Sequence, residues 1–196
     1  MSMVIKKVPI EKSTKNQIKN ALWGYTKYTP EVYVNVVYDD EGFIVKFTVN
    51  EKEPTRTKTK HFESVHLDSC VEYFVNFDPE HSDKYINFET NANGVMNVAF
   101  RSNRYDEKKL ELSEVEGFNI TPEINDEYWT VTYKIGFDFI KKYYPEFDIE
   151  KASYVKGNIY KCGDETPIEH YMSYFEVKCE NPDFHRPEYF GKIEIQ

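Results

Sequence analysis

The sequence predicts an all-β fold: a jelly-roll-like β-sandwich of two antiparallel sheets, with one or two short helices. Residues that favour strands are abundant, with 16 Tyr and 14 Phe among 196 residues. Short segments in which apolar and polar residues alternate recur along the chain, and turn residues separate them. The chain can bury one full core and shows neither a repeat nor a linker, so we expect a single domain over residues 1–196.

The predicted strands follow from this alternation. Segments 31–38 and 43–49 flank the turn Asp39–Gly42, which predicts a β-hairpin. Residues 102–126 are polar and poorly periodic, which predicts a long loop with a short strand near 118–120. Residues 137–144 predict a short helix that Pro145 ends. The remaining strands are expected at 70–77, 85–91, 95–100, 128–135, 153–162 and 191–195.

Composition limits the classes of partner and the compartment. The net charge of −9 argues against nucleic acid and anionic membranes, because phosphate binding needs clustered Lys and Arg. No apolar run approaches the roughly 20 residues of a membrane span. Residues 1–7 lack the apolar core of a signal peptide, so we expect a cytoplasmic protein, with secretion left open if a leader precedes this sequence.

The cysteines do not predict a disulfide framework or a Cys-built zinc site. There are three, Cys70, Cys162 and Cys179, and no pair has CxxC spacing. We expect Cys70 and Cys162 to be buried and to pack like small apolar residues. The histidines also lack the spacing of a metal site, so no cofactor is firmly predicted.

Polar residues gather on one face of two predicted strands. In strand 85–91, Asn87, Glu89 and Asn91 point to the same side, because alternate residues of a strand share a face. If strand 70–77 is its neighbour, Glu72 lies on that side too. Carboxylates, amides and Arg make paired hydrogen bonds to adjacent hydroxyls, and aromatic faces stack on sugar rings, so the pattern favours a hydroxyl-rich ligand. A solvated outer sheet face is the alternative.

Five blocks of the sequence carry a resemblance to a known family. They are 68–75, 85–91 with Gly94, 157–164, His170 with Ser173, and 181–191. On these blocks, which span roughly residues 20 to 196, the chain resembles the family 9 carbohydrate-binding modules, in particular their stand-alone relatives.

The resemblance implies a β-sandwich that binds a terminal sugar without hydrolysing it. In the family, two tryptophans sandwich the sugar ring, and Glu, Arg, Asn and Gln order its hydroxyls. Here His66 and Tyr174 stand at the tryptophan positions, and Glu72 matches the glutamate that contacts ligand. The expected partner is a mono- or oligosaccharide, with the oligomeric state left open. The site residues expected from the resemblance and the strand pattern together are His66, Glu72, Asn87, Glu89, Asn91, Arg101, Arg104, Asn158, Lys161, Tyr174, His185 and Arg186.

Several alternatives stay open at this point. Glu72 could form a structural ion pair with Lys161 or Arg186, and His185 with Arg186 could fix the C-terminal segment to the sheet. A glycoside hydrolase could use Glu72 and Glu89, provided that their carboxyl groups lie about 5–9.5 Å apart.

Two features of the sequence bear on these alternatives. Trp23 and Trp129 could replace the missing tryptophans, although Trp129 lies in the apolar register of its strand. Structural calcium is known in the family, and the acidic turn Asp78, Glu80 and Asp83 offers oxygen ligands.

Overall fold

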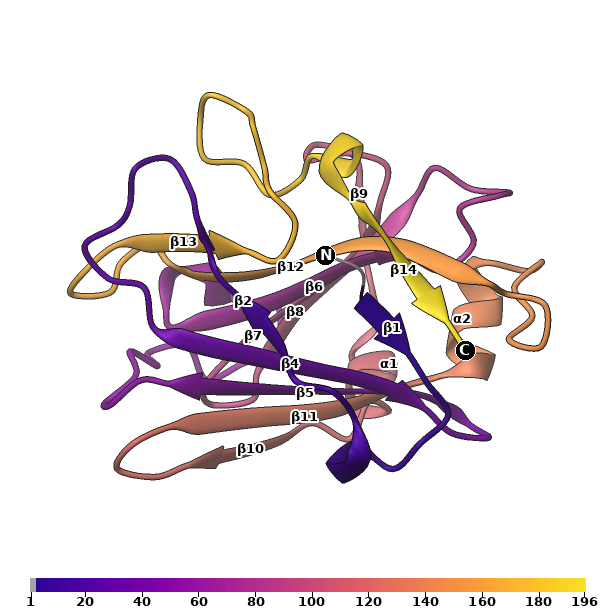
Figure 1. Ribbon diagram of the computed structural model, residues 1–196, viewed down its shortest axis with the longest axis horizontal. Coiled ribbons are helices and arrows are strands. Elements are labelled where there is room, and N and C mark those ends of the chain that lie inside the picture. Colours follow the sequence, from indigo (N-terminus) through magenta and orange to yellow (C-terminus); the bar gives the residue numbers. More distant parts are fainter. Residues whose placement is uncertain (1–2) are drawn as a thin grey trace.

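The computed structural model describes residues 3–196 and places them in two β-sheets that pack face to face (Figure 1). This confirms the predicted sandwich. The smaller sheet has five strands in the order β10-β11-β5-β4-β2, all antiparallel to their neighbours. Its strands are β2 (Asn16–Ile18), β4 (Glu31–Tyr38), β5 (Gly42–Asn50), β10 (Thr121–Ile124) and β11 (Trp129–Gly136).

The larger sheet has nine strands and carries the site described below. Its path runs β1-β14-β12-β6-β7-β8-β9, and β13 and β3 attach beside β12. The strands are β1 (Met3–Ile5), β3 (Asn20–Ala21), β6 (Cys70–Asn76), β7 (Tyr85–Asn91), β8 (Met96–Arg101), β9 (Glu107–Lys109), β12 (Tyr154–Gly163), β13 (His170–Ser173) and β14 (Gly191–Ile195).

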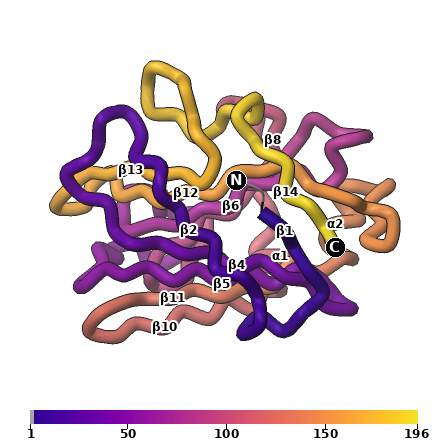
Figure 2. Tube along the Cα trace, viewed as in Figure 1, coloured from indigo at the N-terminus to yellow at the C-terminus, as the bar shows by residue number. Residues whose placement is uncertain are grey.

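One pair of strands departs from the antiparallel expectation. β1 runs parallel to β14, with Met3 opposite Ile193 and Ile5 opposite Ile195. The first and last strands therefore lie side by side (Figures 1 and 2). The side chains of Met3 and Ile5 are fully buried, so this short strand is anchored by packing as well as by hydrogen bonds.

The polar stretch 102–126 holds more structure than the predicted loop. It contains β9, the helix α1 (Leu112–Glu116) and β10, and residues 118–120 are not a strand. Glu111 and Glu114 cap α1 reciprocally, which fixes its start. Asn119 has a φ of 50°, a left-handed conformation that interrupts extended backbone, so the strand begins only at Thr121.

The predicted helix is confirmed as α2 (Phe137–Tyr143). Three short 3-10 turns complete the regular structure: Ile10–Lys12, Val65–Leu67 and Pro187–Tyr189. Over residues 3–196, neither helix has the length and apolar character needed to cross a membrane.

The main core lies between the two sheets. Alternate residues of the strands enter it, as the sequence pattern predicts; for example, Phe88 of β7 stacks on Tyr133 of β11, with ring centroids 5.9 Å apart. Trp129 is fully buried here, and its indole N–H donates to Glu51 at 2.9 Å. Trp129 is therefore a core residue, as its register indicates.

The other face of the larger sheet is covered rather than solvated. A second apolar cluster on it includes Phe74, Tyr85 and Tyr160, and the segment between β13 and β14 closes over them. Phe184 of that segment stacks on Tyr160 with centroids 4.0 Å apart and ring planes 9° apart. The predicted alternative of a bare outer face is thus wrong, and the polar residues of β6 and β7 are buried.

Candidate functional site

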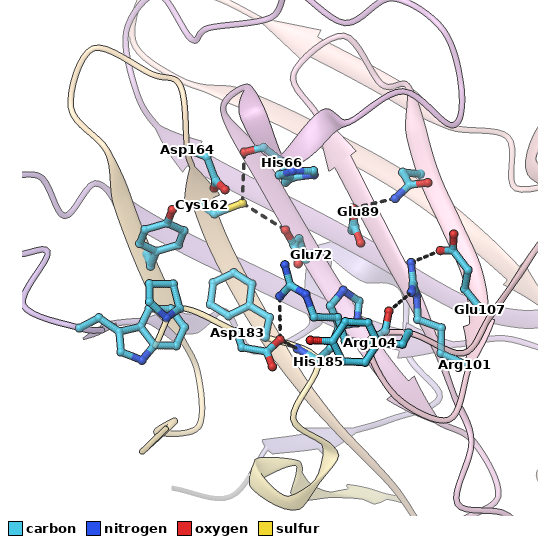
Figure 3. Close-up of a pocket in the computed structure, with 16 residues that line it drawn as sticks. His66, Glu72, Glu89, Arg101, Arg104, Glu107, Cys162, Asp164, Asp183 and His185 are labelled. Atoms are coloured by element: carbon cyan, nitrogen blue, oxygen red, sulfur yellow. Dashed lines mark hydrogen bonds and ion pairs between the residues drawn. The ribbon is translucent and has the colours of Figure 1, made fainter. Parts of the chain in front are cut away.

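A pocket of about 450 Å³ opens on the covered face of the larger sheet (Figure 3). Its floor comes from β6, β7, β8 and β12. Its walls come from the segment after β3, the 3-10 turn Val65–Leu67, the loop after β8, β13 and the segment before β14. The lining residues are Trp23, His66, Glu72, Glu89, Asn97, Arg101, Arg104, Tyr105, Glu107, Cys162, Asp164, Tyr171, Pro182, Asp183, Phe184 and His185.

Two glutamates form the centre of the floor. Glu72 of β6 and Glu89 of β7 are direct cross-strand partners, so their side chains rise from the sheet next to each other. Both are buried, at 3% and 4% exposure. The strand alternation thus brings together the two acids that the sequence pattern placed on one face.

Glu72 has an unusual set of neighbours for a buried carboxylate. Among the described residues its hydrogen-bond donors are two thiols: Cys162 at 3.1 Å and Cys70 at 4.0 Å. Neither predicted partner, Lys161 or Arg186, contacts it. Burial, and then the nearby Cys162 and Glu89, raise the pKa of Glu72 well above its ordinary value.

Glu89 is held by amides instead. Asn87 donates to its Oε1 at 2.8 Å, and Asn97 donates to its Oε2 at 2.9 Å. Asn87 in turn accepts from Arg101 Nε at 2.7 Å. Asn87 thus orients Glu89 and Arg101 from beneath the pocket rather than lining it.

The two arginines extend the polar wall. Arg101 also donates to the Arg104 carbonyl at 3.0 Å and forms an ion pair with Glu107. Arg104 pairs with Asp183 at 2.9 Å and so bridges the loop after β8 to the segment before β14 (Figure 3). These contacts fix the donors of both arginines at one side of the pocket.

Aromatic rings form the opposite wall. Trp23 packs edge-on against Tyr171 and at a tilt against Phe184, with centroids 5.5 and 5.6 Å apart. Its indole N–H donates to the Cys179 carbonyl at 2.8 Å, and its backbone has a φ of 52°. This left-handed conformation is costly for a bulky residue, and such strain is concentrated at functional positions.

His185 both fixes the C-terminal segment and lines the pocket. Its Nδ1 lies 2.9 Å from the Tyr85 hydroxyl, and its ring packs on Phe74 with centroids 4.8 Å apart. Burial, and then Arg101 and Arg104, lower the pKa of His185 to about 3, so the ring is neutral near pH 7. The two predicted roles of this residue are therefore not exclusive.

Lys161 lies on the opposite side of the sheet from the pocket. It pairs with Val71, the core-facing neighbour of Glu72, so its side chain enters the sandwich. There it is fully buried, 2.6 Å from His170 Nε2, 2.9 Å from the Cys162 carbonyl and 3.8 Å from Glu51. Lys161 was expected in the site, but its place on the core-facing side of β12 keeps it out of this pocket.

Four other expected site residues also lie outside the pocket. Asn91 holds the 58–68 loop through Asp68, at 2.8 Å, and Asn158 bonds the backbone of Phe175. Tyr174 is buried in the main core. Arg186 pairs with Glu188 at the surface, 2.7 Å away. Each has protein partners that account for its position.

Ligand atoms suited to a metal ion gather at one place in the described chain. Cys70, Glu72 and Cys162 bring three such atoms within 4.8 Å of one another. The acidic turn does not form a comparable cluster within residues 3–196; there Asp78 instead contacts His81 at 2.9 Å.

The sequence pattern missed Tyr171, Phe184 and the outer acids, and it gave Trp23 only as an alternative stacking residue. Trp23, Tyr171 and Phe184 come from irregular or very short segments, which carry no periodicity. Asp164 and Asp183 likewise follow or precede strands. The Trp23-Gly24 dipeptide and the density of aromatics in 181–191 were the available signals.

Comparison with known structures supports the fold. A protein from Bacteroides uniformis ATCC 8492, provisionally described as carbohydrate-binding, matches with a TM-score of 0.83 and 20% identity over 99% of this chain and 98% of its own. A family 9 carbohydrate-binding module from Caldicellulosiruptor kristjanssonii in complex with cellotriose matches with a TM-score of 0.71 and 9% identity over 100% and 94% of the two chains.

The same kind of module in complex with glucose matches with a TM-score of 0.67 and 10% identity over 99% and 94%. Among curated proteins, no sequence relative of this chain is found. The sequence profile of carbohydrate-binding family 9 matches residues 3–195, nearly the whole chain. This protein therefore belongs to carbohydrate-binding family 9.

Proposed function

We propose that this protein binds a mono- or oligosaccharide in the pocket over β6 and β7, without hydrolysing it. The buried carboxylate of Glu72 carries the proposal. A buried carboxylate is normally surrounded by strong donors, yet this one has only thiols among the described residues. A sugar hydroxyl entering the pocket would supply the missing partner.

The remaining walls suit the same ligand. Asn97 lines the pocket, and its Oδ1 is buried without a donor among residues 3–196. Arg101 and Arg104 provide fixed donors, and the Trp23 side offers aromatic surface for the C–H face of a sugar ring. A volume of about 450 Å³ is within the range of small-molecule pockets.

We propose further that one end of a sugar chain enters. The sheet closes the floor, and the bridge from Arg104 to Asp183 closes one side, so a chain passing through would meet protein. Family 9 relatives have been solved with glucose and with cellotriose, which makes these two the first ligands to test.

The test is calorimetric titration of the full chain with glucose, cellotriose and a panel of other sugars, in buffer with a chelator. Glu72→Gln keeps the shape but replaces the carboxyl group with an amide, and a buried polar group left without its partner costs about 1–3 kcal/mol. We expect the affinity to fall roughly tenfold to a hundredfold. Glu123→Gln, on the exposed strand β10 of the other sheet, is the matched control and should bind like the parent. Absence of binding by every sugar, or equal binding by Glu72→Gln, contradicts the proposal.

The alternative function is glycoside hydrolysis by Glu72 and Glu89. The observation that favours it is their position as cross-strand neighbours in one pocket, with the pKa of Glu72 raised mainly by burial, as for a general acid. An aryl glycoside distinguishes the two functions. Release of the aryl group that disappears in both Glu72→Gln and Glu89→Gln would establish an enzyme, whereas binding without release supports the module.

A further inference from the structure

The strongest feature that carbohydrate binding leaves unexplained is the pair of thiols beneath Glu72. Cys70 of β6 and Cys162 of β12 are direct cross-strand partners. Glu72 follows Cys70 by two residues and therefore points to the same face. The two sulfurs and a carboxylate oxygen lie within 4.8 Å of one another, and no other group of three His, Cys, Asp or Glu in residues 3–196 does so.

The two sulfur–oxygen separations are close to those of a tetrahedral site. With Zn–S of about 2.3 Å and Zn–O of about 2.1 Å, a tetrahedral angle requires roughly 3.6 Å between sulfur and oxygen. The Glu72 oxygen lies 3.1 Å from the Cys162 sulfur and 4.0 Å from the Cys70 sulfur, on either side of that value. Rotamer adjustments of a fraction of an ångström would bring both sulfur–oxygen distances to that value.

The surroundings favour a bound cation. Glu72 is buried beside Glu89, and thiols are weak donors for a carboxylate. Both cysteines are almost completely buried, on central strands that hold their side chains in place. Glu72 and Cys162 also line the pocket, so an ion can enter from there and keep one coordination position facing it.

We propose that Cys70, Glu72 and Cys162 bind a thiophilic divalent cation, with Zn²⁺ as the ion that fits. On binding, the two thiols and any protonated Glu72 carboxyl lose their protons to solvent, and two thiolates and one carboxylate coordinate the metal. The fourth position faces the pocket, where water can occupy it. Two sulfur ligands select Zn²⁺ over Ca²⁺ and Mg²⁺. The absence of CxxC spacing does not argue against this site, because its ligands come from two strands that are far apart in the sequence.

Co²⁺ added alone to the reduced full chain, without sugar, tests the site. Tetrahedral thiolate coordination gives a sulfur-to-cobalt charge-transfer band and intense visible bands, and Zn²⁺ should abolish both by displacement. We expect Cys162→Ser and Cys70→Ser either to lose the charge-transfer intensity or to need about ten times more Co²⁺, or more, to develop it. Glu72→Gln should keep the thiolate band with weaker binding.

Cys179→Ser is the matched control, because Cys179 is the one cysteine outside the cluster and should leave the spectrum unchanged. Zn²⁺ should also raise the Tm of the parent, which Ca²⁺ at the same concentration should not. The proposal is overturned if the parent shows no charge-transfer band, if both Cys70→Ser and Cys162→Ser develop the full band at the same Co²⁺ concentration as the parent, or if Cys179→Ser abolishes it. These readouts use no sugar, and the sugar titrations use a chelator, so each proposal can fail without the other.

Discussion

Replacing Lys161 by Met probes the most deeply buried charge of the sandwich. The ammonium lies 3.8 Å from the Glu51 carboxylate and donates to His170 and to the Cys162 carbonyl. Met fills a similar volume, so the change removes charge and donors with little loss of packing. Removing one partner of a buried pair costs about 3–5 kcal/mol. Trp129 and Tyr28 still donate to Glu51, at 2.9 and 3.3 Å, which favours the lower part of that range.

Urea unfolding followed by circular dichroism measures the effect. With an m-value of about 2 kcal/mol per molar, the loss lowers the midpoint by roughly 1.5–2.5 M. Lys156→Met, on the same strand but exposed, should stay within about 0.5 kcal/mol of the parent. The double variant with Glu51→Gln should lose less than the sum of the single variants, because they share one interaction. A Lys161→Met protein as stable as Lys156→Met would refute this account of the buried pair.

Three further predictions address pH, packing and the pocket. Burial, and then Lys161, lower the pKa of His170 to about 4, so the unfolded state binds its proton first as pH falls from 6.5 towards 4. This residue should therefore lower the free energy of unfolding by about 1.4 kcal/mol for each pH unit of that fall. His170→Gln should flatten the dependence of Tm on pH, whereas His81→Gln, at an exposed position, should not. A methyl at Gly157 would overlap the Phe74 carbonyl oxygen, so Gly157→Ala should cost about 1–3 kcal/mol in urea unfolding, whereas Gly136→Ala, with its nearest neighbour at 3.8 Å, should be close to neutral. Trp23→Ala should weaken sugar binding about threefold to tenfold, and Tyr174→Phe should leave the calorimetric affinity within about twofold of the parent. A larger loss of affinity in Tyr174→Phe than in Trp23→Ala would indicate that Tyr174 stacks on the sugar.

The sequence predicted best where alternation and turn residues agreed. The hairpin of β4 and β5 was located almost to the residue, because the Asp39–Gly42 turn separates two strongly alternating runs. Strands β1, β2, β3 and β13 were missed. Each has only two to four residues, too few to show a period, and their pairing is decided by packing.

The candidate site was predicted in part for the same reason. Glu72 and Glu89 were placed together because strand parity determines which face a side chain occupies. Lys161 was expected in the site because a charged residue is rarely buried in a core. The alternation of β12 nevertheless directs its side chain into the core. The contribution of Trp23 could not be derived from any period, since its position depends on a left-handed backbone and on contacts with segments distant in the sequence.

The parallel pairing of β1 with β14 has a mechanical consequence. The chain enters at the start of β1 and leaves at the end of β14, so a pull on the two ends acts along the strands, in opposite directions. Such a force shears the strand pair and loads its hydrogen bonds together, instead of opening them one at a time. The buried side chains of Met3 and Ile5 must leave the core in the same event. If the protein is held by a ligand and stretched through its ends, the β1–β14 pair would therefore resist the force. This resistance would appear in the rate of unfolding rather than in the equilibrium stability.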